Sequence, residues 1–156
     1  MQTFVKSILN DVQALEYMLK NDWFESDTIR IGAEQEMCIV NAKSYKPAPI
    51  NLDILEKGKH FDWLDQELAR FNLEINLTPH VFTKNCLSKL EKEVNDHLTN
   101  IRKLVKDFDS KIILTGILPT LRKYDLEMHN LTPVPRYYAL MAVSYTHLTL
   151  PTTPYV

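Results

Sequence analysis

The chain has 156 residues, of which 45% are hydrophobic and 24% charged, a composition typical of globular domains that excludes disordered and collagen-like proteins. Its 18 basic and 20 acidic side chains are mixed along the sequence, so no basic patch favours a nucleic acid as partner. Two isolated cysteines, no recognisable signal peptide and no apolar run of about 18 residues favour a cytoplasmic protein that is neither secreted nor membrane-spanning.

Glycine is scarce in this sequence. Only Gly32, Gly58 and Gly116 occur, and no two of them are close enough to form the glycine-rich loops that bind nucleotide phosphates. A nucleotide, if one binds, must therefore be held in another way.

The N-terminal half predicts one helix and two strands. Apolar residues recur every three or four positions over residues 3–20, which predicts an amphipathic helix that covers the core. The period changes to two over residues 29–40 and again over residues 71–77, which predicts two strands, each with one buried face. The segment between them is rich in proline, with one short helical turn expected at residues 52–57.

The C-terminal half predicts two more helices and a third strand. Residues 85–108 carry apolar side chains at helical spacing and form the longest predicted helix. Residues 111–118 are an apolar run that ends at Pro119, as expected for a strand buried on both faces. A polar loop then leads to a helix that begins near Pro135. Together the elements predict an α+β fold in which a sheet packs against helices.

Acidic residues alternate along the first two predicted strands. Glu34 and Glu36 are two positions apart, so both carboxylates project from one face of a strand, and Glu74 occupies the same kind of position on the second strand. If the strands lie in one sheet with their polar faces aligned, the three carboxylates converge. Mg²⁺ or Mn²⁺ would relieve their mutual repulsion. The alternative is an ordinary half-exposed sheet whose glutamates are solvated and apart from one another.

The remaining reactive side chains give weaker signals. The five histidines lack the spacing of a zinc site, and only His129 lies in a loop polar enough to make it a candidate for contacting a ligand. Cys38 and Cys86 have no catalytic partner visible in the sequence, so both are predicted to be buried and unreactive.

Several segments of the chain together resemble a known family. They are IGAEQEM at residues 31–37, FNLEINLTP at 71–79, GILP at 116–119, Thr132-Pro133 and Arg136-Tyr137. In this order they resemble the N-terminal part of glutamate–cysteine ligase family 2, a carboxylate–amine ligase group of the glutamine synthetase-like superfamily, over roughly residues 28–141. The resemblance implies an incomplete glutamine synthetase-like catalytic domain with a curved antiparallel sheet.

The resemblance also implies an ATP-dependent enzyme with small-molecule substrates. Members activate the side-chain carboxylate of glutamate as an acyl phosphate, which an amine such as cysteine attacks to give an amide. Glu34, Glu36 and Glu74 match the carboxylates that bind Mg²⁺ or Mn²⁺. Arg136 matches an Arg-Tyr element and would bind a substrate carboxylate or a phosphate.

Two points qualify what the resemblance implies. Residues 116–119 read GILP where a Gly-Thr-His-Pro-like element is commoner, so no histidine role carries over to this position. A non-catalytic domain of the same fold, which binds a small ligand or a partner, is the alternative to an enzyme.

The last fifteen residues differ in composition from the rest. No Asp, Glu, Lys or Arg follows Arg136, and VSYTHLTLPT at residues 143–152 matches the translation of an adapter used in transposase-based DNA library preparation. We therefore interpret residues 1–141 as a truncated N-terminal part of a ligase domain and residues 142–156 as a non-native tail. A genuine apolar C-terminal strand is the alternative. A truncated domain of this kind is expected to be inactive by itself, with its ATP-binding residues beyond the truncation.

Overall fold

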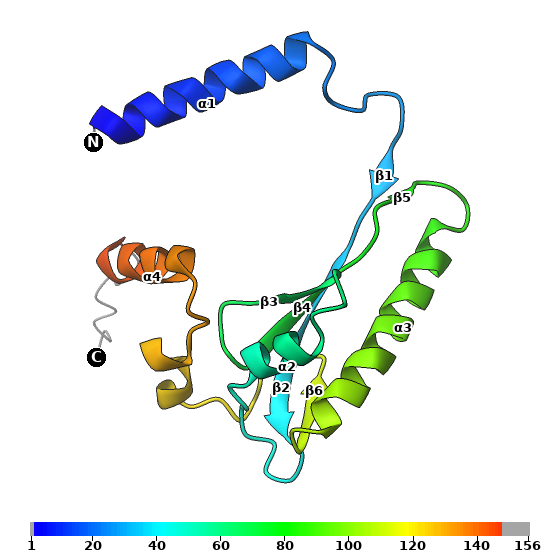
Figure 1. Ribbon diagram of the computed structural model, residues 1–156, viewed down its shortest axis with the longest axis vertical. Helices are drawn as coiled ribbons and strands as arrows, with labels where there is room; N and C mark the ends of the chain where they lie inside the picture. Colours follow the sequence, from blue (N-terminus) through cyan, green and yellow to red (C-terminus); the bar gives the residue numbers. More distant parts are fainter. Residues whose placement is uncertain (1, 148–156) are drawn as a thin grey trace, which may run out of the picture.

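The protein has an α+β fold built around a four-stranded antiparallel sheet (Figure 1). The computed structural model describes residues 2–147. Within this range the sheet has the order β3-β4-β2-β6, with β3 at Leu64–Gln66, β4 at Asn72–Asn76, β2 at Glu34–Asn41 and β6 at Ser110–Ile113. A separate two-stranded sheet pairs β1 (Arg30–Ile31) with β5 (His80–Val81).

Four α-helices accompany the sheets within the described residues. They are α1 (Gln2–Lys20), α2 (Asn51–Lys57), α3 (Cys86–Lys106) and α4 (Pro135–His147). Two short 3₁₀ helices, η1 (Lys123–Leu126) and η2 (Met128–Asn130), lie in the polar loop before α4. The predictions of the longest helix, of the short helical turn and of a helix that begins near Pro135 are confirmed.

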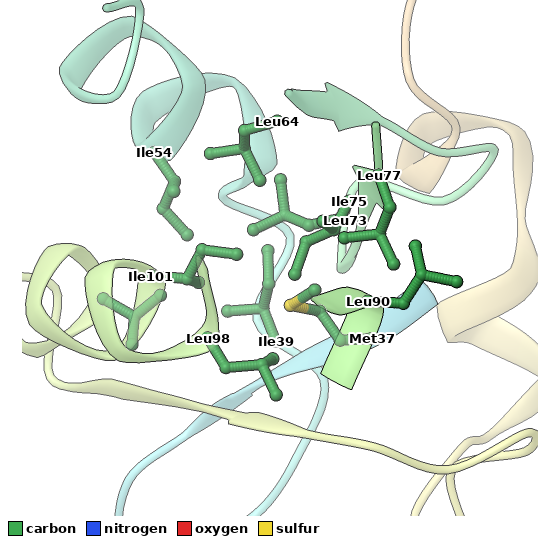
Figure 2. Packing of buried hydrophobic residues seen from close by; sticks show 11 residues of the cluster. Met37, Ile39, Ile54, Leu64, Leu73, Ile75, Leu77, Leu90, Leu98 and Ile101 are labelled. Carbon is green, nitrogen blue, oxygen red and sulfur yellow. The ribbon is translucent and has the colours of Figure 1, made fainter. Parts of the chain in front are cut away.

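The main hydrophobic core lies between the four-stranded sheet and the helices α2 and α3. The apolar faces of β2 and β4 supply one side, and the apolar stripes of the two helices supply the other. The fully buried side chains of this layer include Met37, Ile39, Leu73, Ile75 and Ile101 (Figure 2). Each large apolar side chain buried in this way contributes roughly 1.5–3 kcal/mol to folding. The predicted arrangement of an antiparallel sheet packed with helices is therefore confirmed.

Residues 29–40 form two strands instead of the single predicted strand. β1 ends at Ile31 and β2 begins at Glu34, because the chain leaves the small sheet and enters the large one between them. The C-terminal half of β2 is also buried on both faces, since Cys38 and Val40 pack against Leu118 on the side away from α3. The expectation of one buried face holds only for the first part of β2.

Helix α1 forms where the sequence predicts it, but it does not cover the core. The apolar side chains of Ile8, Val12 and Leu15 are 43%, 57% and 49% exposed, and the helix stands apart from the sheet (Figure 1). Helical periodicity reports an amphipathic face, whereas burial also requires a surface that packs against it. The expectation of a core-covering helix is therefore wrong within the described structure.

The apolar run at residues 111–118 is a strand only at its start. β6 pairs with β2 alone and so lies at the edge of the sheet. Beyond it, Leu114 and Ile117 are 46% and 79% exposed, whereas Leu118 is buried. The expectation of a strand buried on both faces is wrong, because an apolar run by itself does not specify two covering layers.

The C-terminal helix crosses the boundary predicted between native sequence and tail. α4 continues through residues 142–147, which are helical and not extended, so the alternative of a terminal strand does not hold for them. Residues 148–156 lie outside the described residues. The assignment of residues 142–156 to a non-native tail stays a prediction.

Candidate functional site

Three glutamates share the face of the sheet that points away from α2 and α3. In the antiparallel register of β2 and β4, Glu36 pairs directly with Glu74, and Glu34 pairs with Asn76. Directly opposed residues have Cβ atoms about 4.5–5.5 Å apart, and diagonal neighbours such as Glu34 and Glu74 remain within reach of long side chains. The predicted convergence of the three glutamates on one face is confirmed, while their role as metal ligands stays a prediction.

Glu74 is the carboxyl group most strongly affected by this arrangement. It is half-buried, and burial together with the negative charge of Glu34, a hydrogen bond with Glu34 and the charges of Glu67 and Glu36 raises its pKa from 4.5 to about 7. A hydrogen bond between two carboxyl groups requires that one of them carries a proton. A cation in place of this proton would offset the negative charges of the neighbouring carboxylates.

Two further acidic residues extend the same face and were not predicted from the sequence. Asp65 on β3 pairs directly with Glu74, on the side of β4 away from β2. Glu67 follows β3 by one residue, and its charge adds to the rise in the pKa of Glu74. Their two-residue spacing is a possible signal, but β3 is only three residues long and shows too little alternation to be recognised.

Arg136 lies within electrostatic range of these additional carboxylates. Its Nη2 donates a hydrogen bond to Tyr137 Oη at 3.0 Å, and its guanidinium lies 4.9 Å from the centre of the Tyr137 ring. The hydrogen bond and the charge interaction with Tyr137, followed by the charges of Glu67 and Asp65, raise the pKa of Arg136. Glu34, Glu36, Glu74, Asp65 and Glu67 together form what we call the acidic face. The structure therefore brings the predicted arginine toward this acidic face, although its role in binding substrate stays a prediction.

The Thr-Pro segment before α4 explains how Arg136, so late in the chain, comes near this face. Thr132 is completely buried, and its hydroxyl donates to the carbonyl oxygen of Glu67 at 2.5 Å. Asn51 Nδ2 in turn donates to Thr132 Oγ1 at 2.9 Å, and Leu131 forms an isolated β-bridge with Ala69. These contacts fasten the start of α4 to the connection between β3 and β4.

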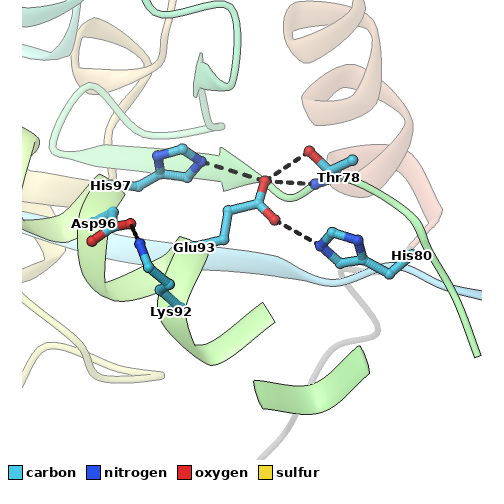
Figure 3. A network of polar contacts seen from close by, with 6 residues as sticks. All are labelled: Thr78, His80, Lys92, Glu93, Asp96 and His97. Carbon is cyan, nitrogen blue, oxygen red and sulfur yellow. Dashed lines mark hydrogen bonds and ion pairs between the residues drawn. The ribbon is translucent and has the colours of Figure 1, made fainter. Parts of the chain in front are cut away.

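The end of β4 is held by a second polar cluster, which surrounds Glu93 on α3 (Figure 3). The Glu93 carboxylate accepts hydrogen bonds from the backbone N–H of Thr78 at 2.9 Å and from the Thr78 hydroxyl at 2.8 Å. His80 Nε2 lies 3.2 Å and His97 Nε2 3.6 Å from its oxygens. Burial alone would raise the pKa of Glu93, but these donors and charges outweigh burial and lower it. The cluster fixes the second Thr-Pro segment, at residues 78–79, against α3.

The other residues singled out in the sequence lie elsewhere. The His129 ring lies tilted against the Tyr124 ring, with 4.5 Å between ring centres, and its Nε2 contacts Asn130 Nδ2 at 3.1 Å. Cys38 and Cys86 are buried as predicted, and burial raises the pKa of the Cys38 thiol. His129 as a ligand contact stays a prediction.

The donor set of the acidic face suits a hard divalent cation, although the cluster is not closed around one. Among residues 2–147, no three His, Cys, Asp or Glu side chains are arranged so that they could enclose a metal ion together. Glu34 nevertheless interacts with Glu74 closely enough to raise its pKa, Glu36 lies opposite Glu74, and all three offer the oxygen donors that Mg²⁺ and Mn²⁺ prefer. The described residues therefore offer donors of the kind that such an ion takes, without enclosing one.

Most of the chain matches one protein family. Residues 30–149 match the model described as glutamate-cysteine ligase family 2 (GCS2). The chain belongs to glutamate–cysteine ligase family 2. Neither the curated proteins nor the solved structures contain a match.

Membership in glutamate–cysteine ligase family 2 indicates a ligase. The matched range runs from β1 to beyond the end of α4 and contains the three glutamates and Arg136, whereas α1 lies outside it. Within the described residues, none of the helices combines the length and the apolar character needed to cross a membrane.

Proposed function

We propose that this chain carries the metal-binding part of the active site of an ATP-dependent carboxylate–amine ligase. The observation that carries the proposal is the register of β2 and β4, which places Glu36 directly opposite Glu74 and Glu34 diagonal to Glu74 on the open face of the sheet. Family membership supports the ligase class, and the raised pKa of Glu74 supports a cation at this place.

The proposed reaction joins an acid and an amine at the expense of ATP. The terminal phosphoryl group of ATP passes to the carboxylate of a glutamate-like acid, and ADP leaves. An amine such as cysteine then attacks the carbonyl carbon of the acyl phosphate, loses a proton and displaces inorganic phosphate, which leaves an amide. A reaction that consumes ATP and a free thiol fits a reducing, cytoplasmic compartment.

Each polar residue of the face has a proposed task in this reaction. Glu34, Glu36 and Glu74 would hold Mg²⁺ or Mn²⁺, and the ion, when bound, supplies charge neutralisation and orientation of the ATP phosphates. Arg136 would turn its guanidinium from Tyr137 toward a substrate carboxylate or phosphate, because its planar donors suit either group. The scarcity of glycine supports this assignment, since phosphates are then held by a metal and side chains and not by a glycine-rich loop.

Mn²⁺ binding, followed through the relaxation of water protons, tests the metal site on this chain. We expect binding by the wild type and a loss of affinity of about tenfold or more in Glu74→Gln and Glu34→Gln, since each removes one charged ligand. Glu91→Gln is the matched control, because Glu91 is an exposed glutamate on α3. The site is wrong if the wild type does not bind Mn²⁺ or if all three variants behave alike.

ATP turnover tests the ligase assignment separately from the metal site. In the full-length protein supplied with glutamate and cysteine, we expect phosphate release and amide formation, both abolished by Glu34→Gln. Metal binding without turnover of ATP would instead support the non-catalytic domain of the same fold.

A further inference from the structure

A groove lies apart from the three glutamates, where the polar loop before α4 meets the start of β4. It has a volume of about 460 Å³, which is within the usual range of roughly 300–1,000 Å³ for sites that bind small molecules. Its walls come from three separate parts of the chain, represented by Pro47, Arg70 and Tyr124. The proposed ligase chemistry does not use these residues, so the groove requires its own explanation.

Arg70 is the distinctive group of this groove. Its Nε–H group is buried, and it has no hydrogen-bond acceptor among the described residues. The backbone of Arg70 is firmly fixed, because its N–H donates to the carbonyl oxygen of Asn130 at 2.7 Å and its carbonyl oxygen accepts from the Asn51 N–H at 2.9 Å. A buried donor without an acceptor is costly, particularly on a charged group. Arg70 lines the groove, so an anionic ligand there would satisfy this donor once the guanidinium turns its Nε–H toward the ligand.

The opposite wall of the groove is ordered by its own contacts and does not supply this acceptor. Asn130 Nδ2 donates to the Tyr124 carbonyl oxygen at 3.2 Å and contacts His129 Nε2 at 3.1 Å. The Asn130 side-chain amide is therefore already engaged by these two neighbours. Asp125 also lines the groove, but one of its oxygens already accepts the N–H of Arg122 at 2.8 Å.

We propose that this groove binds a small organic acid through its carboxylate, with Arg70 as the principal contact. A planar guanidinium forms two parallel hydrogen bonds with a carboxylate, which would use the Nε–H that now lacks an acceptor. Pro47 and the Tyr124 ring provide apolar surface for the carbon chain of the acid. The assignment rests on residues other than the acidic face and stands independently of the proposed ligase reaction.

The charges around the groove favour a carboxylate over a phosphate. Arg70 contributes one positive charge, and the neighbouring carboxylate of Asp125 contributes one negative charge. A doubly charged phosphate would be repelled by Asp125 more strongly than a singly charged carboxylate. The charges of Arg70 and Asp125 therefore predict tighter binding of a carboxylate than of a phosphate.

The side-chain Nε–Hε resonance of Arg70 in ¹⁵N-labelled protein provides a local probe. We expect it to shift saturably when acetate or butyrate is added at constant ionic strength, with butyrate tighter, while phosphate binds at least several-fold more weakly. Sodium chloride at the same ionic strength should cause no saturable shift. The proposal is overturned if neither carboxylate gives a saturable shift, if chloride reproduces it, or if phosphate binds more tightly.

Two arginine variants separate binding in the groove from general attraction of anions. Arg70→Lys keeps the charge but loses the planar fork, so we expect the affinity for butyrate to fall about tenfold. Arg102→Lys, at an exposed position on α3, should leave the affinity unchanged. Equal affinities of Arg70→Lys and the wild type would contradict the role of Arg70. The titration of the wild type decides the proposal by itself if Arg70→Lys does not fold.

Discussion

Glu36 and Glu74 face each other directly across β2 and β4, so two acidic side chains lie opposite one another on the same side of the sheet. Like charges in directly opposed positions destabilise a pair of strands. The sheet keeps them because its other face is fully packed against α2 and α3, with Met37 and Leu73 as the pair buried immediately beside them. A well-packed core on one face therefore supports an electrostatically unfavourable arrangement on the other.

Replacing Glu74 should stabilise the protein at alkaline pH. The pKa of Glu74 is about 7 in the folded state and about 4.5 otherwise, so the folded state binds more protons between these values and stability falls as the pH rises through this window. Glu74→Gln removes the effect. We expect the variant to be more stable than the wild type at pH 8 by about 1–2 kcal/mol, after allowance for solvent screening, and nearly equal at pH 4.5.

Urea unfolding at the two pH values measures this difference. Glu91→Gln, on the exposed side of α3, should show no comparable dependence on pH. Addition of Mn²⁺ at pH 8 should stabilise the wild type more than Glu74→Gln. A Glu74→Gln variant that is less stable than the wild type at pH 8 would disprove the repulsion.

Replacing Glu93 should have the opposite dependence on pH. Its pKa is lowered by Thr78, His80 and His97, so its contribution to stability is present above pH 4.5 and is lost as the pH falls through the lower folded value. Glu93→Gln should lose about 1–2 kcal/mol at pH 6–7, with a smaller loss near pH 3. Chemical unfolding at both pH values checks this, with Glu91→Gln as the control from the same helix. An equal loss of stability at both pH values would mean that the negative charge of Glu93 does not cause the loss.

Removing the hydroxyl of Thr132 should weaken the attachment of the last helix. Thr132→Val loses the bond to the Glu67 carbonyl and the 2.9 Å bond from Asn51 Nδ2, which keeps only its longer bond to the Ala69 carbonyl, so the change should cost about 1–3 kcal/mol. Thr132→Ser keeps the hydroxyl and should lose less. Thermal unfolding of the two variants against the wild type measures the difference, and the interpretation fails if valine is tolerated as well as serine.

Apolar residues in α1 and α3 should differ sharply in their contribution to stability. Leu98 is 3% exposed, so Leu98→Ala should cost about 2–5 kcal/mol. Leu15 is 49% exposed, so Leu15→Ala should change stability by less than about 0.5 kcal/mol. Denaturant unfolding of both variants makes the comparison. A large loss in Leu15→Ala would show that α1 packs against a surface in solution.

The sequence identifies elements whose residues are neighbours along the chain. α3 is predicted because its apolar residues repeat at helical spacing over 21 residues, and β4 because its residues alternate over five. β3 and β5 are too short to carry either pattern, so only their pairing with other strands reveals them. The same limit applies to Asp65, which becomes part of the acidic face only through its pairing with Glu74.

That Glu34 and Glu36 project from one face of a strand follows from the sequence, because a strand places every second side chain on the same side. The position of Glu74 opposite Glu36 depends on the pairing of β2 with β4, since a register shift of one residue would have turned Glu74 into the core. The tertiary structure also leaves α1 apart from the core of the described residues and brings Arg136 within electrostatic range of Glu67 and Asp65. Local periodicity follows from backbone geometry, whereas register and burial depend on packing between distant segments of the chain.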